Sequence, residues 1–455
     1  MILKELTDTL RGVAGFDENM FLEAHHAAKP PVSIRVNPLK WVESNADLSP
    51  GMPVPWAKHG YYLNHRPVFT LDPWLHAGAY YVQEASSMFL EQAVHKVLQE
   101  IDIQYVLDLC AAPGGKSTHL LGCLEAQTVL VSNEVVGARA GILVENLTKW
   151  GNSNSIVTQN DPSFFGGYEG LFDLLVVDAP CNGSGLFRRE PALVSEWSPA
   201  HVDLCSQRQK RILADVLPAL APGGFLLYST CSYSAAEDEN IIDWLSGQFN
   251  LEGVDIEWAD NQCGVVVSKA SASGIPCYRF FPDRVKGEGF FMALLRKPGT
   301  HLAFNLKQPK GKMPDVSMPS VLNDCIRVAE PLFFHRHDFA VYAMPEKVYM
   351  LFQHLRGKLN IRKAGVKVGD LMHGKLNPAH DLALSGLLQK GAFFPIDADR
   401  ENALNYLRRA GADFGNNFPS GWLLVCYKDL PLGFVKNIGS RLNNYYPKDW
   451  RIRMA

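Results

Sequence analysis

The sequence has few of the features that mark membrane, secreted or zinc-bound proteins. No stretch approaches the roughly 18 consecutive apolar residues that a transmembrane helix requires. The N-terminus, Met1 to Asp8, has no long apolar stretch, so no signal peptide is expected. The nine cysteines are an odd number and no two of them stand at C-x-x-C spacing, so neither a disulfide framework nor a metal site is expected. These absences predict a cytoplasmic protein with reduced thiols and no membrane partner.

The sequence also has little net charge, formally −3 at pH 7, which alone does not suggest a nucleic-acid partner. The charge is unevenly distributed, however. Residues 301–455 carry 22 Lys and Arg against 13 Asp and Glu, whereas residues 1–300 carry 22 against 34. Basic and aromatic residues interleave near the C-terminus: Lys428, Lys436, Arg441, Lys448, Arg451 and Arg453 with Tyr427, Phe434, Tyr445, Tyr446 and Trp450. Such a segment can bind a phosphate backbone and stack on bases, although a solvated face explains the charge equally well.

Short apolar runs and helix-like segments alternate through the middle of the chain. The strand-like runs are 105–110, 129–134, 172–178 and 225–230, and the helix-like stretches include 138–150, 201–217 and 237–249. Strands alternating with helices of this length predict βαβ units around a parallel sheet, an α/β fold. A later run, 289–296, is expected to add an antiparallel strand at the edge of that sheet.

Composition divides the chain into four expected parts. Residues 1–75 are expected to form a small N-terminal α+β domain with a strand at 32–36, and residues 76–298 the α/β domain. Residues 299–385 begin as a linker rich in Pro, Lys and Gln and continue into a first C-terminal unit. Residues 386–455 form a second small unit.

Two cysteines lie in turn-like motifs that follow strand-like runs. Cys181 stands in the segment Asp-Ala-Pro-Cys-Asn-Gly-Ser-Gly, which begins at Asp178, and Cys231 stands in Tyr-Ser-Thr-Cys-Ser, which begins at Tyr228. In an open α/β sheet, ligands bind outside the carboxyl ends of the strands. Two thiols delivered to that edge suggest chemistry that uses a sulfur nucleophile.

The segment from Val106 to Thr118 is typical of a strand, a turn of small residues and a helix start. Small residues let the backbone approach a ligand, and the helix N-terminus offers unpaired N–H groups. The segment is not G-x-G-x-x-G, so the dinucleotide fingerprint fails. It nearly fits the P-loop, but Cys110 replaces the first glycine and Pro113 removes an N–H group. An NTPase therefore stays open as an alternative.

Carboxylates recur where successive predicted strands end. Asp108, Glu134, Asp161 and Asp178 follow one another in this way, which is consistent with a site for a methionine-bearing nucleoside. Glu134 is placed to bind ribose hydroxyls, as an acid about 20 residues past the turn does in dinucleotide folds. Asp161 would accept from an adenine amine. The alternative for each is a strand-end acid that caps a nearby helix.

Together these motifs resemble the Nol/Nop/Sun family of RNA cytosine-5 methyltransferases. The resemblance extends to Ser33–Asn37 and to Val82–Met88, and the segment from Gly433 to Leu442 is similar to the small PUA-like domain that ends RsmF-type ribosomal RNA methyltransferases. It implies a Rossmann-like class I methyltransferase domain that uses S-adenosyl-L-methionine, with RNA-binding domains at both ends of the chain. It also implies methylation of a cytosine in small-subunit ribosomal RNA.

The resemblance carries site roles to matching positions. The methionine part of the cofactor would be surrounded by Cys110, Ala111, Ala112, Pro113, Gly114, Gly115 and Lys116, with Glu134 on the ribose, Asp161 on the adenine and Asp178 between cofactor and base. Cys231, after threonine, would be the nucleophile, and Cys181, after proline, would help release the product. Arg188 and Arg189 are candidates for a phosphate clamp, and the other seven cysteines are expected to be packing residues.

Several alternatives remain open at this point. Ribosomal RNA or the small ribosomal subunit is the expected partner of a monomeric enzyme, but transfer RNA would suit the same chemistry. A P-loop-like NTPase and a non-catalytic ribosome assembly factor are alternatives from other classes. Within the methyltransferase class, attack by Cys181 is the rival to attack by Cys231, because DNA cytosine methyltransferases use the cysteine after proline.

Overall fold

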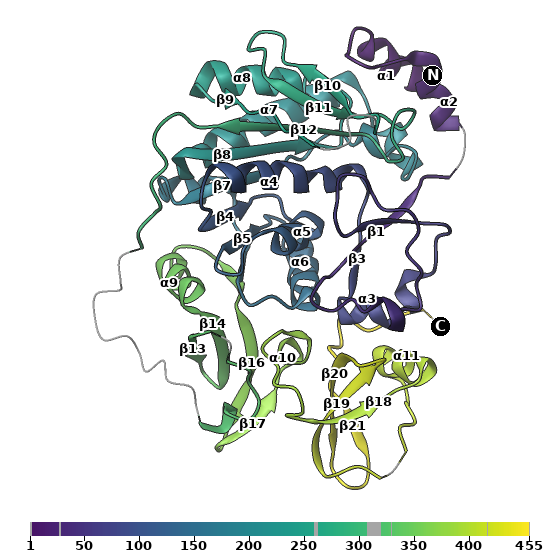
Figure 1. Cartoon of the computed structure of the whole chain (residues 1–455), viewed down its shortest axis with the longest axis vertical. Coiled ribbons are helices and arrows are strands. Elements are labelled where there is room, and N and C mark those ends of the chain that lie inside the picture. The colour runs from purple at the N-terminus through teal and green to yellow at the C-terminus, as the bar shows by residue number, and fades with distance from the viewer. Residues whose placement is uncertain are drawn as a thin grey trace.

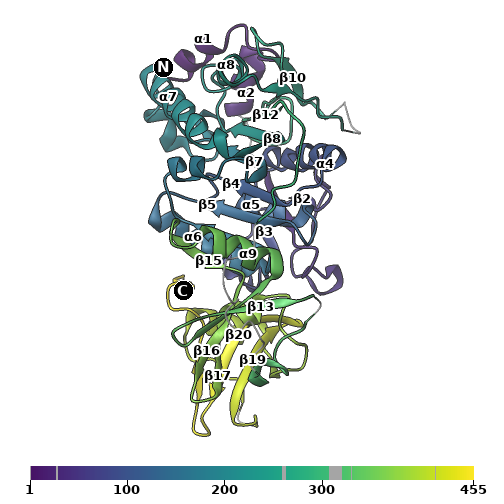
Figure 2. The same ribbon diagram turned by 90° about the vertical axis from the view of Figure 1, so that its left-hand side faces the viewer.

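The computed structural model describes residues 2–26, 29–258, 263–306, 320–328, 330–415 and 417–454. Figures 1 and 2 show a large sheet flanked by helices, N-terminal elements along one side of it, and two small sheets beyond one of its edges. Within these residues, no helix has the length and apolar character needed to cross a membrane.

The N-terminal elements include a three-stranded antiparallel sheet, whereas the first two helices pack against Trp197 and Tyr233 of the central part rather than against this sheet. The N-terminal elements are α1 (Ile2–Leu10), α2 (Glu18–His26), β1 (Val32–Val36), β2 (Gly60–Leu63), α3 (Pro73–Ala77) and β3 (Tyr80–Val82). The strand order is β2-β1-β3, so the strand expected at 32–36 is confirmed at the centre of the sheet. The third strand of this sheet, β3, lies beyond residue 75, where the sequence predicts the end of the N-terminal domain.

The central part is a doubly wound sheet. Its elements are α4 (Leu90–Glu100), β4 (Tyr105–Asp108), α5 (Gly115–Cys123), β5 (Val129–Asn133), α6 (Gly137–Trp150), β6 (Ser155–Thr158), β7 (Phe172–Asp178), α7 (Pro199–Val216), β8 (Leu220–Thr230), α8 (Glu239–Phe249), β9 (Glu252–Gly253), β10 (Val266–Lys269), β11 (Pro276–Phe280) and β12 (Phe290–Arg296). Strands β8-β7-β4-β5-β6 are parallel neighbours in that order. The predicted Rossmann-like α/β fold is confirmed.

The sheet extends further on both sides than the sequence predicts. Strand β12 is antiparallel to β8, as expected, but it is not an edge strand, because β11 and β10 pair beyond it. Its residues Phe290 to Leu295 are all buried, which requires other elements to cover both faces and both edges of the strand. On the opposite side, β15 (Ile361–Ala364) leaves the first C-terminal unit and pairs antiparallel with β6.

Two four-stranded sheets make up the rest of the C-terminal third. The first has the order β13-β14-β16-β17 and the second β18-β19-β20-β21. Their elements are β13 (Leu332–His337), β14 (Ala340–Pro345), α9 (Glu346–Leu355), β16 (Val366–Met372), β17 (Lys375–Pro378), α10 (His380–Leu384), β18 (Phe394–Asp397), α11 (Arg400–Arg408), β19 (Gly421–Tyr427), β20 (Leu430–Asn437) and β21 (Leu442–Asn444). Most of the expected linker, 307–319, lies outside the described residues, and the boundaries expected at 75, 298 and 385 stay predictions.

The last sheet shares a hydrophobic core with the N-terminal elements. Ile34 of β1 and Trp74 of α3 belong to the same buried cluster as Ile396, Leu404 and Tyr446. The expectation that the C-terminal aromatics stack on bases is therefore wrong for part of the set. Tyr427, Phe434 and Tyr446 are each less than 5% exposed, because they fill cores. Tyr445 keeps 47% of its surface exposed.

Candidate functional site

The two cysteines singled out from the sequence meet at the carboxyl edge of the parallel sheet. Strands β7 and β8 are parallel neighbours with Asp178 opposite Ser229, so the loops that follow them start side by side. We call residues 179–185 the Cys181 loop and residues 231–238 the Cys231 loop. The sulfur atoms of Cys181 and Cys231 lie 3.2 Å apart, within hydrogen-bond distance. Both residues are only partly buried, so this edge offers two adjacent thiols to a ligand.

A buried carboxylate joins the two cysteine loops. Glu237 accepts hydrogen bonds from the backbone N–H of Asn182 at 3.0 Å and from the hydroxyl of Ser232 at 2.7 Å. It also accepts from the side-chain amide of Asn182 and from that of Gln209. Asn182 and Ser232 directly follow the two cysteines, so this carboxylate fixes the separation of the sulfurs. Glu237 is not predicted from the sequence, because an acid at a helix start looks like an ordinary cap.

The electrostatic setting distinguishes the two thiols. The hydrogen bond to Cys231 and, next, burial raise the pKa of Cys181 well above its usual value. Cys181 therefore stays a protonated thiol at neutral pH and can donate its proton toward the Cys231 sulfur. Cys231 then accepts this hydrogen bond and is the candidate for nucleophilic attack, because the thiolate is the nucleophilic form of cysteine.

A charged pair lies where the same edge meets the glycine-rich turn. Lys116 Nζ is 2.7 Å from Asp178 Oδ2, and the Ser229 hydroxyl donates to Asp178 Oδ1 at 2.8 Å. Asp178 is therefore held by the first turn of α5 and by the end of β8 together. Its side chain remains 36% exposed, so it can still contact a ligand.

The turn between β4 and α5 is held in place by hydrogen bonds to its carbonyl groups. Its carbonyl groups already have protein partners: Gly114 N–H donates to Ala111, Arg139 to Ala112 and Asn146 to Pro113. The first N–H groups of α5 have no partner within the helix and are left for a ligand. Gly114 has φ +112°, and a Cβ there would come 3.2 Å from Leu143, so the turn requires glycine at this position.

Asp108 is a carboxylate with one unsatisfied oxygen. The Ser117 hydroxyl donates to its Oδ2 at 2.6 Å, whereas Oδ1 is buried and has no hydrogen-bond partner among the described residues. Burial raises the pKa of Asp108 to about 7. A cationic or donor group of a ligand would satisfy this oxygen and favour the ionised form.

The four strand-end carboxylates follow adjacent strands in the order β7, β4, β5, β6. Glu134 is 3% exposed, accepts from the Val136 N–H at 2.9 Å and has Arg139 3.4 Å from its other oxygen. Asp161 accepts the Ser163 N–H, which is the largest cause that lowers its pKa, and lies 3.6 Å from Arg211. Asp161 thus caps a helical turn, as the alternative interpretation stated, and its proposed contact with adenine stays a prediction.

One of the two arginines expected to clamp phosphate is not available for it. The side chain of Arg188 is only 9% exposed, and its guanidinium donates to the Gly287 carbonyl at 3.2 Å beside Glu288. The expected phosphate contact is wrong for Arg188, because the loop turns it inward. Arg189 is exposed and remains a candidate.

Comparisons with known proteins find relatives over most of the chain. Family models match the chain over residues 95–296 (16S rRNA methyltransferase RsmB/F), 4–85 (N-terminal domain of 16S rRNA methyltransferase RsmF) and 393–452 (methyltransferase RsmF PUA domain). The chain is 28% identical over 445 residues to the ribosomal RNA small subunit methyltransferase F of Shewanella piezotolerans, covering 92% of this chain and 90% of that protein.

Two solved structures share the fold. A methyltransferase homolog protein from Pyrococcus horikoshii matches with a TM-score of 0.51 at 27% identity, over 65% of this chain and 98% of that one. NSun6 from Pyrococcus horikoshii, solved with SFG, matches with a TM-score of 0.50 at 18% identity, over 62% of this chain and 94% of that one. At that identity the second likeness speaks for the fold alone.

Proposed function

This chain belongs to the 16S rRNA methyltransferase RsmB/F family, and we propose that it methylates carbon-5 of a cytosine in small-subunit ribosomal RNA through a covalent adduct with Cys231. S-adenosyl-L-methionine is the proposed methyl donor. The observation that carries the proposal is the pair of sulfurs, 3.2 Å apart, at the carboxyl edge of the sheet beside Asp178 and Lys116. The small-subunit substrate comes from the relatives' names.

The two-thiol arrangement suits the difficulty of the reaction. Carbon-5 of cytosine is too weak a nucleophile to take a methyl group unaided. Addition of the Cys231 thiolate to carbon-6 forms a C–S bond and moves electron density to carbon-5. Carbon-5 would then bond to the methyl carbon of the bound donor, whose sulfonium–methyl bond would break and leave S-adenosylhomocysteine. Transfer of the carbon-5 proton to a water molecule and breakage of the C–S bond restore the aromatic ring and release Cys231. One hard step becomes several easier ones.

Cys181 has the properties of a proton donor in the last step. Its raised pKa keeps it protonated, and its sulfur lies next to the sulfur that must leave. Transfer of this proton to the departing sulfur of Cys231 helps to break the C–S bond, and its return to Cys181 regenerates the Cys231 thiolate, so Cys181 promotes release of the methylated base. Asp178, held by Lys116, is the proposed acceptor for the exocyclic amine of the cytosine.

The turn and its neighbouring carboxylates fit the proposed cofactor. S-adenosyl-L-methionine, when bound, supplies a methyl group activated by a sulfonium. The unsatisfied Oδ1 of Asp108 suits a cationic group, the buried Glu134 suits ribose hydroxyls, and the glycines of the turn allow close approach of the backbone. Asp161 is the proposed contact for adenine.

The exposed C-terminal residues are the proposed RNA contacts. Tyr445 and Trp422 rings lie 4.4 Å apart, and Lys436 Nζ lies 4.9 Å from the Trp422 ring centre. Arg441, Lys448, Arg451 and Arg453 are exposed nearby in the sequence. Aromatic faces beside cations suit single-stranded RNA, whose bases are free to stack. Lys428 contributes less, because its amine is paired with Asp47 at 2.5 Å.

Two cysteine variants test the chemistry. Cys231→Ala is expected to abolish methylation and to form no adduct. Cys181→Ala is expected to accumulate a protein–RNA adduct that survives denaturing electrophoresis, because the second thiol no longer helps to break the C–S bond. Bisulfite sequencing of ribosomal and transfer RNA identifies the methylated nucleotide. An adduct from Cys231→Ala and none from Cys181→Ala would reverse the two roles.

A binding measurement separates the enzyme from the NTPase alternative. Calorimetry with S-adenosylhomocysteine and with ATP is expected to show binding of the first and none of the second. Binding of ATP alone would contradict the proposed function.

A further inference from the structure

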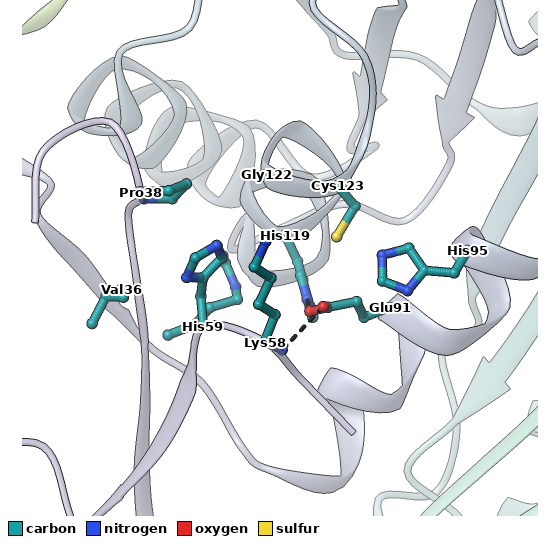
Figure 3. Close-up of a pocket in the computed structure, with 10 residues that line it drawn as sticks. Val36, Pro38, Lys58, His59, Glu91, His95, His119, Gly122 and Cys123 are labelled. Atoms are coloured by element: carbon teal, nitrogen blue, oxygen red, sulfur yellow. Dashed lines mark hydrogen bonds and ion pairs between the residues drawn. The ribbon is translucent and has the colours of Figure 1, made fainter. Parts of the chain in front are cut away.

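Two pairs of metal-ligating residue types face each other across two packed helices. Glu91 and His95 stand four residues apart on α4, and His119 and Cys123 stand four residues apart on α5. Residues four apart lie on the same face of a helix, and α4 and α5 pack together. Figure 3 shows the side chains of all four residues turned toward the space between the helices.

The candidate ligand atoms are close together and shielded from water. One ligand atom each from Glu91, His119 and Cys123 lies within 4.8 Å of the other two. Glu91 and His119 are 4% and 1% exposed, and Cys123 is half-buried. Together with His95 they line a cavity of about 210 Å³ between α4, α5 and the N-terminal sheet. Tetrahedral zinc bonds of about 2.0–2.3 Å place ligand atoms about 3.3–3.8 Å apart, so a closure of about 1 Å completes the site.

Other contacts already orient two of these ligands. His119 Nε2 lies 3.0 Å from Glu91 Oε2, and the Lys58 backbone N–H donates to Glu91 Oε1 at 3.0 Å. The Gln83 amide nitrogen lies 3.5 Å from His119 Nδ1. The Lys58 contact is of the kind that fixes the direction of a metal ligand in proteins. The Gln83 contact is not, because its amide nitrogen is a donor and cannot accept the proton that Nδ1 carries when Nε2 binds a metal. Binding a cation would replace the His119–Glu91 hydrogen bond while leaving the Lys58 contact in place.

A nearby positive charge opposes the binding of a cation. The Arg35 guanidinium lines the same cavity. It donates to Gln83 Oε1 at 2.8 Å and to the Thr118 hydroxyl at 2.6 Å, and it lies 4.4 Å from the Trp150 ring centre. The guanidinium is thus held by protein acceptors and by an aromatic face. The carboxylate of Glu91 and a thiolate at Cys123 together supply two negative charges, which match a divalent cation.

We propose that Glu91, His119 and Cys123 form a binding site for a divalent cation of the zinc class, with His95 or a water molecule as the fourth ligand. A thiolate, an imidazole and a carboxylate form a donor set that suits zinc better than magnesium or calcium. The sequence-based expectation of no metal relied on C-x-x-C spacing, which does not detect ligand pairs on helices. The site joins the last turn of α5 to α4, whereas the first turn of α5 is the proposed cofactor site. Its role is therefore to fix the helix that presents the cofactor turn.

Cobalt substitution tests this site without measuring methylation. The metal-stripped full chain is titrated with Co²⁺, whose bond to a thiolate gives a charge-transfer absorption band in the near ultraviolet. The band is expected for the wild type and for Cys325→Ser, a half-buried cysteine elsewhere that serves as the matched control. It is expected to be absent from Cys123→Ser. His119→Gln removes a ligand and is expected to weaken binding by more than the roughly 10-fold to 100-fold that loss of an outer contact costs.

Melting curves separate loss of the site from loss of the fold. Zn²⁺ is expected to raise the melting temperature of the wild type and of Cys325→Ser, and to leave that of Cys123→Ser and His119→Gln unchanged. If the serine variant does not fold, His119→Gln carries the same test. No thiolate band in the wild type, or a band that persists in Cys123→Ser, would overturn the proposal, whatever the outcome for methylation.

Discussion

Glu237→Gln tests whether one carboxylate sets the distance between the two sulfurs. The carboxylate accepts from four donors, two on each oxygen. Oε1 accepts from the backbone N–H of Asn182 and from the side-chain amide of Gln209, and Oε2 accepts from the side chains of Asn182 and Ser232. An amide accepts at only one of these positions, so two donors lose their acceptor. Rotation of the Asn182 amide cannot repair the loss, because its Oδ1 already accepts the Ser184 N–H at 2.8 Å.

The magnitude follows from the burial of these donors. Asn182, Ser232 and Gln209 are at most 4% exposed, so water cannot replace the missing acceptor. Each buried donor left unsatisfied costs about 1–3 kcal/mol, and two of them lower the free energy of unfolding by about 2–6 kcal/mol. Urea denaturation of Glu237→Gln measures this loss. The exposed Glu252 of β9 provides the control variant Glu252→Gln, which is expected to unfold like the wild type.

A second measurement asks whether the carboxylate positions Cys231 or merely stabilises the fold. In the Cys181→Ala background, under conditions where the protein is fully folded, Glu237→Gln is expected to reduce the yield of the protein–RNA adduct, because the Cys231 loop is no longer tied to Asn182. If Glu237→Gln unfolded at the same urea concentration as the wild type, the hydrogen-bond argument would be refuted. An undiminished adduct yield would refute the positioning role.

Three further predictions concern charge. Burial raises the pKa of Asp108 from 3.8 to about 7. The protonated form therefore stabilises the fold at low pH, and the free energy of unfolding falls by about 1.4 kcal/mol per pH unit as pH rises from about 4 to about 7. Urea denaturation of ligand-free Asp108→Asn should not show this decrease with pH. Replacing Arg441, Arg451 and Arg453 by Ala is expected to lower the slope of log affinity for single-stranded RNA against log salt by about 2. The affinity for S-adenosylhomocysteine should not change, and Lys269→Ala, at an exposed position of β10, is the control. Arg189→Met is expected to weaken RNA binding, whereas Arg188→Met, whose side chain is buried, should reduce stability and leave the salt slope unchanged.

The sequence predicted the parallel sheet because its strands are buried on both faces. Residues 172–177, for example, are all buried in β7, and an apolar run of this kind is detectable without knowledge of its partners. The meeting of Cys181 and Cys231 followed from the same rule, since the carboxyl ends of parallel strands share one edge. Asp161 shows the limit of the rule, because a strand-end acid that caps a turn and one that binds a ligand look alike in sequence.

Other features depend on partners that are distant in the chain. Strand β15 contains Arg362 and Lys363 within four residues, and its partner β6 precedes it by about 200 residues, so no local pattern marks it as part of the central sheet. The inward turn of Arg188 toward Gly287 likewise depends on a contact across 99 residues. Charge alone suggested a phosphate contact there, and only the packing of the loop shows otherwise.

The same distant contacts determine how the RNA-binding role of the C-terminal third can be tested. Deletion from residue 385 would remove Ile396, Leu404 and Tyr446 from the core they share with Ile34 and Trp74. The exposed apolar surface would then destabilise the N-terminal sheet as well. In the first C-terminal unit, β15 pairs with β6, the strand that leads to Asp161, so removal of that unit would disturb the cofactor edge. A truncated chain that lost RNA binding would therefore not locate the contact. Surface substitutions at Arg441, Arg451 and Arg453 leave both cores intact, so a change in salt slope with unchanged cofactor affinity can be assigned to phosphate contacts.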